Sequence, residues 1–381
     1  MGLIYLDNNA TTMVAPEVVK EMLPYFEMYY GNPSSVHTFG SQVNQKIEEA
    51  RSKVARLLGA EPEEIIFTSC GTESDNTAIM SAVESFPNKR HIITTKVEHP
   101  AVMNFCKHLL KKGYEITFLP VDRLGCLDID DLKKAINNNT FLVTVMYANN
   151  ETGNIYPIKE IGDILRERNI LFHTDAVQAV GKIKIDLKEL NVDMLSLSGH
   201  KLHAPKGIGA LYVRKGTRFY PYIIGGRQEF GRRAGTENVA SIIGLGKACE
   251  LALERMDSEM IYISNLRDKL EKSLLSLCPD SRINGDIGNR LPNTTNISFE
   301  NIKGGSILLK LNEYGICASS GSACSSGSLE PSHVLMAMGV STTAIYGSIR
   351  FSLSRYNNEE EIDKVIEIVP SIVKELRSLS T

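Results

Sequence analysis

The feature that most constrains the fold is an alternation of short apolar runs and amphipathic helical patterns between residues 64 and 214. His91–Thr95, Thr140–Ala148 and Ile170–Ala176 have the length and composition of buried strands. Ile158–Arg168, between two of them, has the spacing of a helix with one apolar face. Strands and helices that alternate through short loops predict an α/β fold, in which helices cover both faces of a largely parallel sheet.

Polar side chains follow the predicted strands at the points where those strands end. In open α/β sheets, ligands bind beyond the carboxyl ends of the strands. The pattern therefore predicts one site at this edge of the sheet, lined by Thr72, His99, Asn150, Asp175, Gln178, Ser198, His200 and Lys201.

Lys201 and Asp175 are the two most informative residues in this set. Lys201 closes the motif S-G-H-K after the strand Val192–Leu197, and Asp175 lies at the end of Ile170–Ala176. A lysine can form a Schiff base with the aldehyde of pyridoxal 5′-phosphate (PLP), and an acid can keep its pyridine nitrogen protonated. Considered alone, Lys201 is more simply interpreted as a surface lysine and Asp175 as a capping residue at a strand end. The PLP hypothesis therefore needs the other motifs.

A possible phosphate site follows the predicted strand Glu64–Ser69. The segment Cys70–Ser74 (C-G-T-E-S) precedes a helix that we expect to begin near Asn76. Free N–H groups and the helix dipole favour an anion at such a position. An ordinary loop with a capping threonine fits equally well, and the nucleotide motif G-x-x-x-x-G-K-[ST] does not occur.

The helix that precedes this strand is predicted to have Ser41 as its N-cap and to end at Gly59.

The last third of the chain predicts an α+β unit that contains an unusual loop. Ser319–Ser328 reads S-S-G-S-A-C-S-S-G-S, without a large side chain to pack. We expect this loop to be mobile and its Cys324 to be an exposed candidate nucleophile. The other six cysteines lie in or beside apolar stretches, which predicts structural roles.

The domain boundary is predicted within a long helical stretch, Val239–Leu277, at a break near Ser258. This divides the chain into a large α/β domain, residues 16–258, and a small α+β domain, residues 1–15 and 259–381, which carries the loop 319–330.

The segment Gly225–Asn238, rich in glycine and arginine, precedes this long helical stretch. It could bind an anion, but its composition favours a mobile surface loop.

Composition excludes several classes of function. The formal net charge is −3 over 381 residues, which favours neither nucleic acid nor an anionic membrane surface as a partner. We find no apolar run long enough to span a bilayer and no signal-peptide pattern at the start. Seven cysteines without a C-x-x-C pair indicate free thiols, so we expect a cytoplasmic protein.

Taken together, the motifs resemble those of the NifS/IscS-type cysteine desulfurases, in the PLP-dependent class V aminotransferase family. The likeness covers nearly the whole chain and includes Y-L-D-N-N-A-T-T, G-N-P-S-S, N-N-E-T-G, H-T-D-A-V-Q, S-G-H-K, R-R-A-G-T-E-N and S-S-G-S-A-C. The wording T-S-C-G-T-E-S and V-E-H-P-A-V is closer to the nitrogen-fixation branch, NifS. The resemblance implies PLP-dependent fold type I, with a mostly parallel seven-stranded sheet in the large domain and a homodimeric assembly.

The resemblance also implies roles for individual residues. Lys201 would hold PLP and move the substrate α-proton, His99 would stack on the ring as acid or base, and Cys324 would attack the substrate sulfur. The implied cofactor-binding residues are Gly71, Thr72, His99, Asn150, Asp175, Gln178, Ser198, His200, Lys201 and Thr236 of the partner subunit. The implied substrate-binding residues are Asn32 and Arg350, which would clamp the substrate carboxylate.

The reaction implied by the resemblance converts L-cysteine to L-alanine and leaves a persulfide on Cys324. The sulfur would pass to an iron–sulfur scaffold or another acceptor protein, with nitrogenase maturation as a special case and Cys324 as a transient iron–sulfur ligand. Two alternatives stay open. One is another class V PLP enzyme, an aminotransferase or a selenocysteine lyase. The other is a non-enzymatic thiol or metal carrier, with ligand pairs His200/His203 and His173/Asp175.

Overall fold

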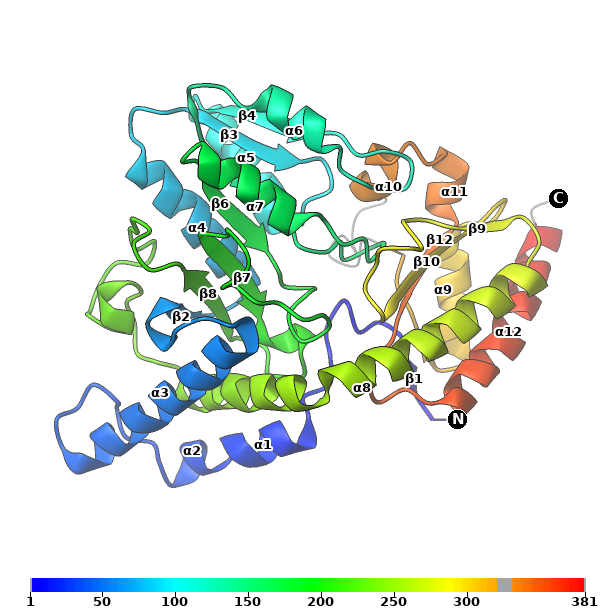
Figure 1. Ribbon diagram of the computed structural model, residues 1–381. Helices are drawn as coiled ribbons and strands as arrows, with labels where there is room; N and C mark the ends of the chain where they lie inside the picture. Colours follow the sequence, from blue (N-terminus) through cyan, green and yellow to red (C-terminus); the bar gives the residue numbers. More distant parts are fainter. Residues whose placement is uncertain (1, 321–330, 380–381) are drawn as a thin grey trace.

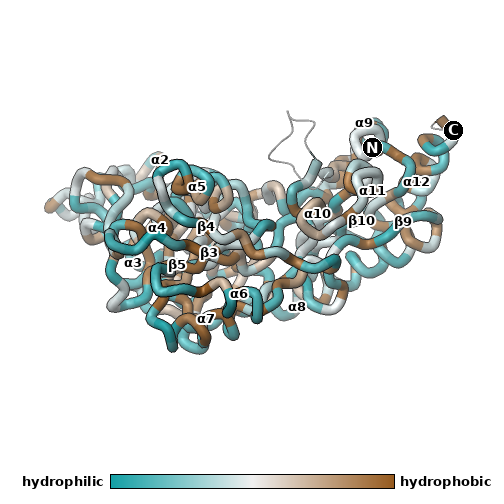
Figure 2. The backbone as a smooth tube through the Cα atoms, turned by 90° about the horizontal axis from the view of Figure 1, so that it is seen from above, coloured by the Kyte–Doolittle hydropathy of each residue, from teal (hydrophilic) through white to brown (hydrophobic). Residues whose placement is uncertain are grey.

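The computed structural model describes residues 2–320 and 331–379. The chain forms an elongated molecule with a large sheet-containing unit at one end and a smaller unit at the other (Figure 1). The view from above shows the same separation, and the long helix α8 (Val239–Leu277) runs along both units (Figure 2).

The large unit is built on a seven-stranded sheet with the strand order β2-β8-β7-β6-β5-β3-β4. β8 is antiparallel to both of its neighbours, β2 and β7, and the other pairs of neighbouring strands are parallel. This confirms the mostly parallel sheet. The strands are β2 (Ile65–Thr68), β3 (His91–Thr95), β4 (Glu115–Leu119), β5 (Thr140–Thr144), β6 (Leu171–Asp175), β7 (Met194–Ser198) and β8 (Gly209–Val213).

Helices cover both faces of this sheet because its strands send alternate apolar side chains to opposite sides. In β2, Ile65 and Phe67 join the core on one face, while Ile66 joins the core on the other. The helices α4 (Gly71–Ser85) and α5 (Pro100–Lys111) cover the face of Ile66. The face of Phe67 is covered by α3 (Thr38–Leu58), α7 (Ile158–Glu167) and the first half of α8, with α6 (Ile129–Ala135) contributing Leu132.

Two helix starts differ from the sequence predictions. α3 begins at Thr38, and its N-cap is His37, whose Nδ1 accepts from the Gly40 N–H, rather than Ser41. α4 begins at Gly71 rather than near Asn76, because Glu73 in its first turn accepts from the Ser69 N–H and closes the turn. The end of α3 at Gly59, in a left-handed conformation with φ 66°, agrees with the prediction.

The small unit contains a three-stranded antiparallel sheet with the order β12-β10-β9. Its strands are β9 (Ser281–Ile283), β10 (Thr294–Phe299) and β12 (Ser348–Ser352), and its helices are α9 (Gly304–Glu313), α10 (His333–Ala337), α11 (Thr342–Tyr346) and α12 (Glu359–Ser378). The N-terminal strand β1 (Ile4–Tyr5) pairs in parallel with β11 (Ile316–Cys317) of this unit. The chain then leaves the small unit for α1 (Pro16–Met22) and α2 (Pro24–Glu27), beside α8.

The predicted break at Ser258 is wrong, because α8 is continuous through it. The first half of the helix, up to Met256, packs in the core of the large unit. The second half, from Ile263 onward, packs in the core of the small unit. The buried residues keep one helical spacing through the junction: Leu245, Cys249, Ala252 and Met256 are followed by Ile263, Leu266, Leu270 and Leu274. The domain division at residue 258 stays a prediction.

The segment 225–238 is anchored, contrary to the mobile surface loop favoured by its composition. Glu229, buried within it, forms an ion pair with Arg51 of α3, with Arg51 Nη1 2.6 Å from Glu229 Oε2. The same carboxylate accepts from the Phe67 N–H at 2.8 Å. Arg51 is 178 residues away in the sequence, so local composition carries no sign of this contact.

We predict that Arg51→Leu destabilises the protein by about 3 to 5 kcal/mol, because it leaves the Glu229 carboxylate buried without its cation. Urea unfolding followed by circular dichroism measures the change. Lys46→Leu is the matched control on the same helix, since the Lys46–Glu49 pair is about half exposed; it should cost less than about 1 kcal/mol. Equal losses in the two variants would refute the anchoring role.

Candidate active site

The sheet brings the predicted strand-end residues to one edge. β7, β6, β5 and β3 are consecutive in the sheet and parallel where they pair, so their carboxyl ends lie together. Ser198 ends β7, Asp175 ends β6, and the segments after β5 and β3 carry Asn150 and His99. The small unit faces this edge through its strand β12 (Figure 1).

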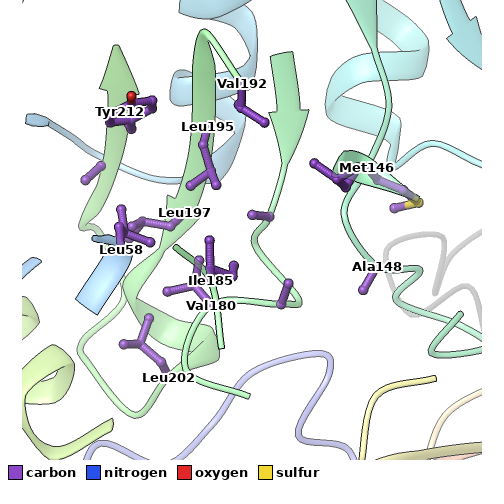
Figure 3. Packing of buried hydrophobic residues seen from close by; sticks show 14 of the residues in the cluster. Leu58, Met146, Ala148, Val180, Ile185, Val192, Leu195, Leu197, Leu202 and Tyr212 are labelled. Carbon is purple, nitrogen blue, oxygen red and sulfur yellow. The ribbon is translucent and has the colours of Figure 1, made fainter. Parts of the chain in front are cut away.

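Lys201 lies in a single 3-10 turn, Gly199–Lys201, directly after β7. Its ammonium donates to the backbone carbonyls of Asn9 at 2.5 Å and Ala10 at 2.7 Å. Figure 3 shows Leu197 and Leu202, one on each side of this turn, in the buried cluster that contains Leu58. The cluster fixes the backbone of the turn, so the Lys201 side chain is directed toward the N-terminal segment.

Asp175 is almost completely buried at the end of β6. Burial raises the pKa of its carboxyl to about 6, against the opposing effects of the Val177 N–H and the Lys201 cation. The Val177 N–H donates to Asp175 Oδ1 at 2.9 Å. At neutral pH, Asp175 is therefore ionised and can hold a protonated pyridine nitrogen.

His99 is the N-cap of α5, and its Nδ1 accepts from the Ala101 N–H at 3.2 Å. Burial, with the charge of Lys201 and the proximity of His333, lowers the pKa of His99 to about 4. The ring is therefore neutral at pH 7, and since Nδ1 is an acceptor, the proton is on Nε2. His99 can present an N–H to a bound group while α5 holds its ring in place.

The start of α4 and the end of β7 form a site suited to an anion. Cys70, the N-cap of α4, makes no capping bond through its side chain. A Cβ at Gly71 would lie 2.7 Å from Val177 Cγ2, so the close approach of these segments requires glycine. Ser198 Oγ is buried and, within residues 2–320 and 331–379, has no hydrogen-bond partner. Such an orphaned hydroxyl beside helix N–H groups fits a phosphate.

His200 lies at the same edge, where its Nδ1 is 3.1 Å from Thr11 Oγ1. Burial and the neighbouring cations, Lys201 first, lower the pKa of His200 to about 4. It is therefore neutral at pH 7 and would contribute a hydrogen bond rather than a charge.

Arg350 reaches this edge from β12 of the small unit. Its guanidinium donates from Nη1 to Asn150 O at 2.9 Å and from Nη2 to Asp7 Oδ1 at 2.7 Å. The side chain is 1% exposed. A buried guanidinium held by hydrogen bonds has a fixed orientation, which suits bidentate recognition of a carboxylate.

Two predicted residues do not converge with the others within one chain. Asn32 lies in the connection between α2 and α3, and this connection is at the opposite end of the molecule from β12 (Figure 1). Thr236 is exposed in the segment 225–238. Cys324 lies outside the described residues.

Sequence reasoning missed several buried titratable groups behind the site. Glu98 is fully buried, and it accepts from the Thr95 hydroxyl at 2.8 Å and from the Met146 N–H at 3.0 Å. Burial raises the pKa of its carboxyl to about 8. Asp75 is also buried, and burial, together with the charge of Asp175, raises its pKa. The apolar spacing around these residues contains no signal that the carboxylates share one low-dielectric region.

The described thiols and imidazoles do not support a metal centre. Cys106, Cys249 and Cys278 are buried, while Cys70, Cys126 and Cys317 are partly exposed. In the described part of the chain, no three His, Cys, Asp or Glu residues group to hold a metal ion. No helix there is long and apolar enough to cross a bilayer.

Comparison with known proteins gives consistent matches over the whole chain. Residues 4–365 match the family model described as Aminotransferase class-V. The chain is 61% identical over 380 residues to a cysteine desulfurase of Trichormus azollae, covering 100% of this chain and 95% of that protein. It is 57% identical over 381 residues to the cysteine desulfurase NifS of Azotobacter vinelandii, with the same coverage. A solved NifS-like protein superposes with a TM-score of 0.93 at 42% identity, covering 98% of this chain and all of that one.

We predict that Glu98 makes the protein less stable as the pH rises. Its pKa is about 8 in the folded chain, against an ordinary value of 4.5. Between these values the folded chain keeps a proton that the unfolded chain has lost, so stability falls as the pH rises through this window. Glu98→Gln should reduce the loss between pH 5.5 and 8.5 by at least about 1 kcal/mol, since one pKa unit is worth about 1.4 kcal/mol.

Urea unfolding at the two pH values measures this effect. Glu115→Gln is the control, because Glu115 is an exposed carboxylate at the start of β4; it should keep the wild-type difference. An unchanged difference in Glu98→Gln would show that Glu98 is ionised in the folded protein.

Proposed function

The chain belongs to the aminotransferase class-V family, and we propose that it is a PLP-dependent cysteine desulfurase that converts L-cysteine to L-alanine. The observation that carries this proposal is the convergence of Lys201, Asp175 and His99 at one sheet edge, faced by Arg350 of the small unit. The full-length similarity to proteins named cysteine desulfurase supports the same activity.

The residues at the sheet edge fit PLP in both charge and shape. Lys201 would carry the cofactor covalently, and the Asp175 carboxylate would hold the pyridine nitrogen. The start of α4, at Gly71 and Thr72, would bind the phosphate together with the orphaned Ser198 hydroxyl and His200. Gln178 and Asn150 would contact the phenolic oxygen. When bound, PLP supplies an electron sink that stabilises negative charge at the substrate α-carbon.

The side chains around this group divide the remaining tasks. Arg350 would bind the substrate carboxylate, exchanging one of its present hydrogen bonds to Asp7 or Asn150. Lys201 Nζ would remove the α-proton and return a proton. His99 is neutral and carries its proton on Nε2. It would cover the ring of PLP and act as an acid by donating this Nε2 proton.

Sulfur transfer is assigned to Cys324. Its thiolate would attack the substrate sulfur, forming an S–S bond while the substrate carbon–sulfur bond breaks. The electron pair of the broken bond stays with carbon, which takes up a proton, so the products are L-alanine and a Cys324 persulfide. The persulfide sulfur would pass to an acceptor protein such as an iron–sulfur scaffold, in the cytoplasm, with Cys324 as a transient cluster ligand.

A second copy of the chain would complete the site. The loops that contain Asn32 and Thr236 expose large apolar side chains: Tyr30, Val36, Ile224 and Phe230. Exposed apolar side chains gathered in two loops are typical of a protein interface. A homodimer would cover them and bring Thr236 of the partner subunit to the phosphate and Asn32 toward a substrate site.

We predict that Lys201→Ala lowers alanine formation from L-cysteine by at least ~10³-fold, since it removes both the covalent attachment and the base. Borohydride reduction of the wild type should place the pyridoxyl group on Lys201. A label on Lys182, the neighbouring lysine, would contradict the assignment.

Cys324→Ala should retain the bound cofactor and its absorption while losing alanine release by at least ~10²-fold, because no thiolate accepts the sulfur. Cys126→Ala is the matched control: Cys126 lies in the large unit between β4 and α6, with its Sγ 3.7 Å from Asp286 Oδ2, and its loss should leave turnover unchanged. Normal turnover in Cys324→Ala, or turnover that depends on an added 2-oxo acid, would favour another class V enzyme.

The shared site predicts a specific behaviour of mixed dimers. Lys201→Ala and Thr236→Ala chains should each be defective, but a hybrid contains one site with an intact Lys201 and an intact Thr236 of the partner subunit. Hybrids should therefore recover about half of the wild-type activity at limiting PLP. If Thr236 acts within its own chain, the hybrids recover nothing beyond the Thr236→Ala level.

A further inference from the structure

Lys182 is a second lysine beside Lys201, and no step of the proposed reaction uses it. It lies in the turn after β6 and is partly buried. It also lines a cavity of about 40 Å³, together with Lys201, Asn8 and Asn293. A lysine whose charge is withdrawn from water requires partners, and these partners indicate its role.

The Lys182 side chain bonds to two amide oxygens. Its Nζ donates to Gln178 Oε1 at 2.8 Å and approaches Asn9 Oδ1 at 3.3 Å. Gln178 and Lys182 are four residues apart in a helical turn, so they project from the same side. The nitrogen of Lys182 carries enough N–H groups for both contacts whether it is an ammonium or a neutral amine.

The other end of the Gln178 amide is also held. Gln178 Nε2 donates to Asn9 O at 3.0 Å, and Lys201 Nζ donates to the same carbonyl. Lys182 Nζ donates to Oε1 of this amide, and the Asn9 carbonyl accepts from its Nε2. Only one orientation of the amide fits, because a flip would place its –NH₂ group against the Lys182 donor and its oxygen against the Asn9 carbonyl. The Gln178 –NH₂ group therefore stays beside Lys201 Nζ.

This orientation matters for the proposed cofactor. In PLP, the aldehyde carbon and the phenolic oxygen are carried by adjacent ring atoms, so the Gln178 –NH₂ group beside Lys201 Nζ would be placed to reach that oxygen when the cofactor is bound. The phenolic oxygen is an anionic acceptor when the cofactor is bound through lysine. The second N–H of Gln178 is available to donate to it, whereas a flipped amide would present an oxygen.

We propose that Lys182 is a positioning residue that holds the Gln178 amide with its nitrogen toward the phenolic oxygen of the cofactor. The proposal rests on the PLP-dependent function proposed above. Lys201 and Arg350 already supply positive charge close to Lys182. This favours a role for Lys182 through its hydrogen bonds rather than through its own charge. The other titratable groups around Lys182 are His200, His203, Glu259 and Arg355.

The test is the pH titration of the visible absorption of the bound cofactor. A donor to the phenolic oxygen favours the deprotonated, more negative form of the cofactor–lysine linkage. Lys182→Met, which keeps the length of the side chain but removes its N–H groups, should raise the pKa of this linkage by about 0.5 to 1 unit, the value of one hydrogen bond. It should also weaken PLP binding by about three- to tenfold.

Matched variants separate positioning from other effects. Lys182→Arg keeps a donor-only side chain and should stay close to the wild type. Lys184→Met removes an exposed lysine two residues away and should change nothing. The decisive comparison is Lys182→Met in a Gln178→Ala background: if Lys182 acts through Gln178, the second substitution adds no further shift.

Three results would overturn the proposal: no shift in folded Lys182→Met, the same shift in Lys182→Arg, or a full additional shift in the Gln178→Ala background. The last would show a direct effect of the Lys182 charge. If Lys182→Met does not fold, Lys182→Gln takes its place, with a smaller shift because its amide retains a donor. If the wild type binds no PLP at all, it is the proposed function that fails.

Discussion

The active-site edge depends on the hydrogen bonds of one buried residue, Asn9. Its carbonyl accepts from Lys201 and Gln178, while its side chain donates to Asn150 O and to Thr294 Oγ1 of the small unit. The N-terminal segment is thereby held between the sheet edge and the three-stranded sheet. Because β1 is paired within the small unit, a shift of that unit would move this segment and the lysine bound to it.

Buried charge is the main energetic cost of the site. Asp175, Glu98 and Asp75 share a region closed to water, where ionisation is unfavourable, so their pKa values are raised. Arg350, also buried, has Asp7 as its partner. A bound cofactor and substrate offer opposite charges to Asp175 and Arg350, and their binding would offset part of this cost. The site is thus arranged for ligands that carry both signs of charge.

The elements of the sheet could be predicted because each is a local pattern. The strand His91–Thr95 and the helix Val239–Leu277 have the predicted bounds, since hydrophobic periodicity reports burial directly. The two helix starts that were predicted wrongly depend on local side-chain caps, those of His37 and Glu73. The other two errors arose where a distant contact overrides the local pattern. The continuity of α8 at Ser258 depends on packing in two cores, and the anchoring of the segment 225–238 depends on Arg51.

The sequence by itself determined the α/β alternation, the edge at which the site forms and the chemical types available there, including Lys201, Asp175 and His99. These follow from local periodicity and from the rule that parallel strands end at one edge. Only the tertiary structure decided which side chains hold those groups: the Asn9 carbonyl on Lys201, Lys182 on Gln178, and Asp7 on Arg350. The physical reason is that hydrogen bonds and ion pairs depend on distance and direction in space, and partners far apart in the chain leave no pattern in the sequence around either residue.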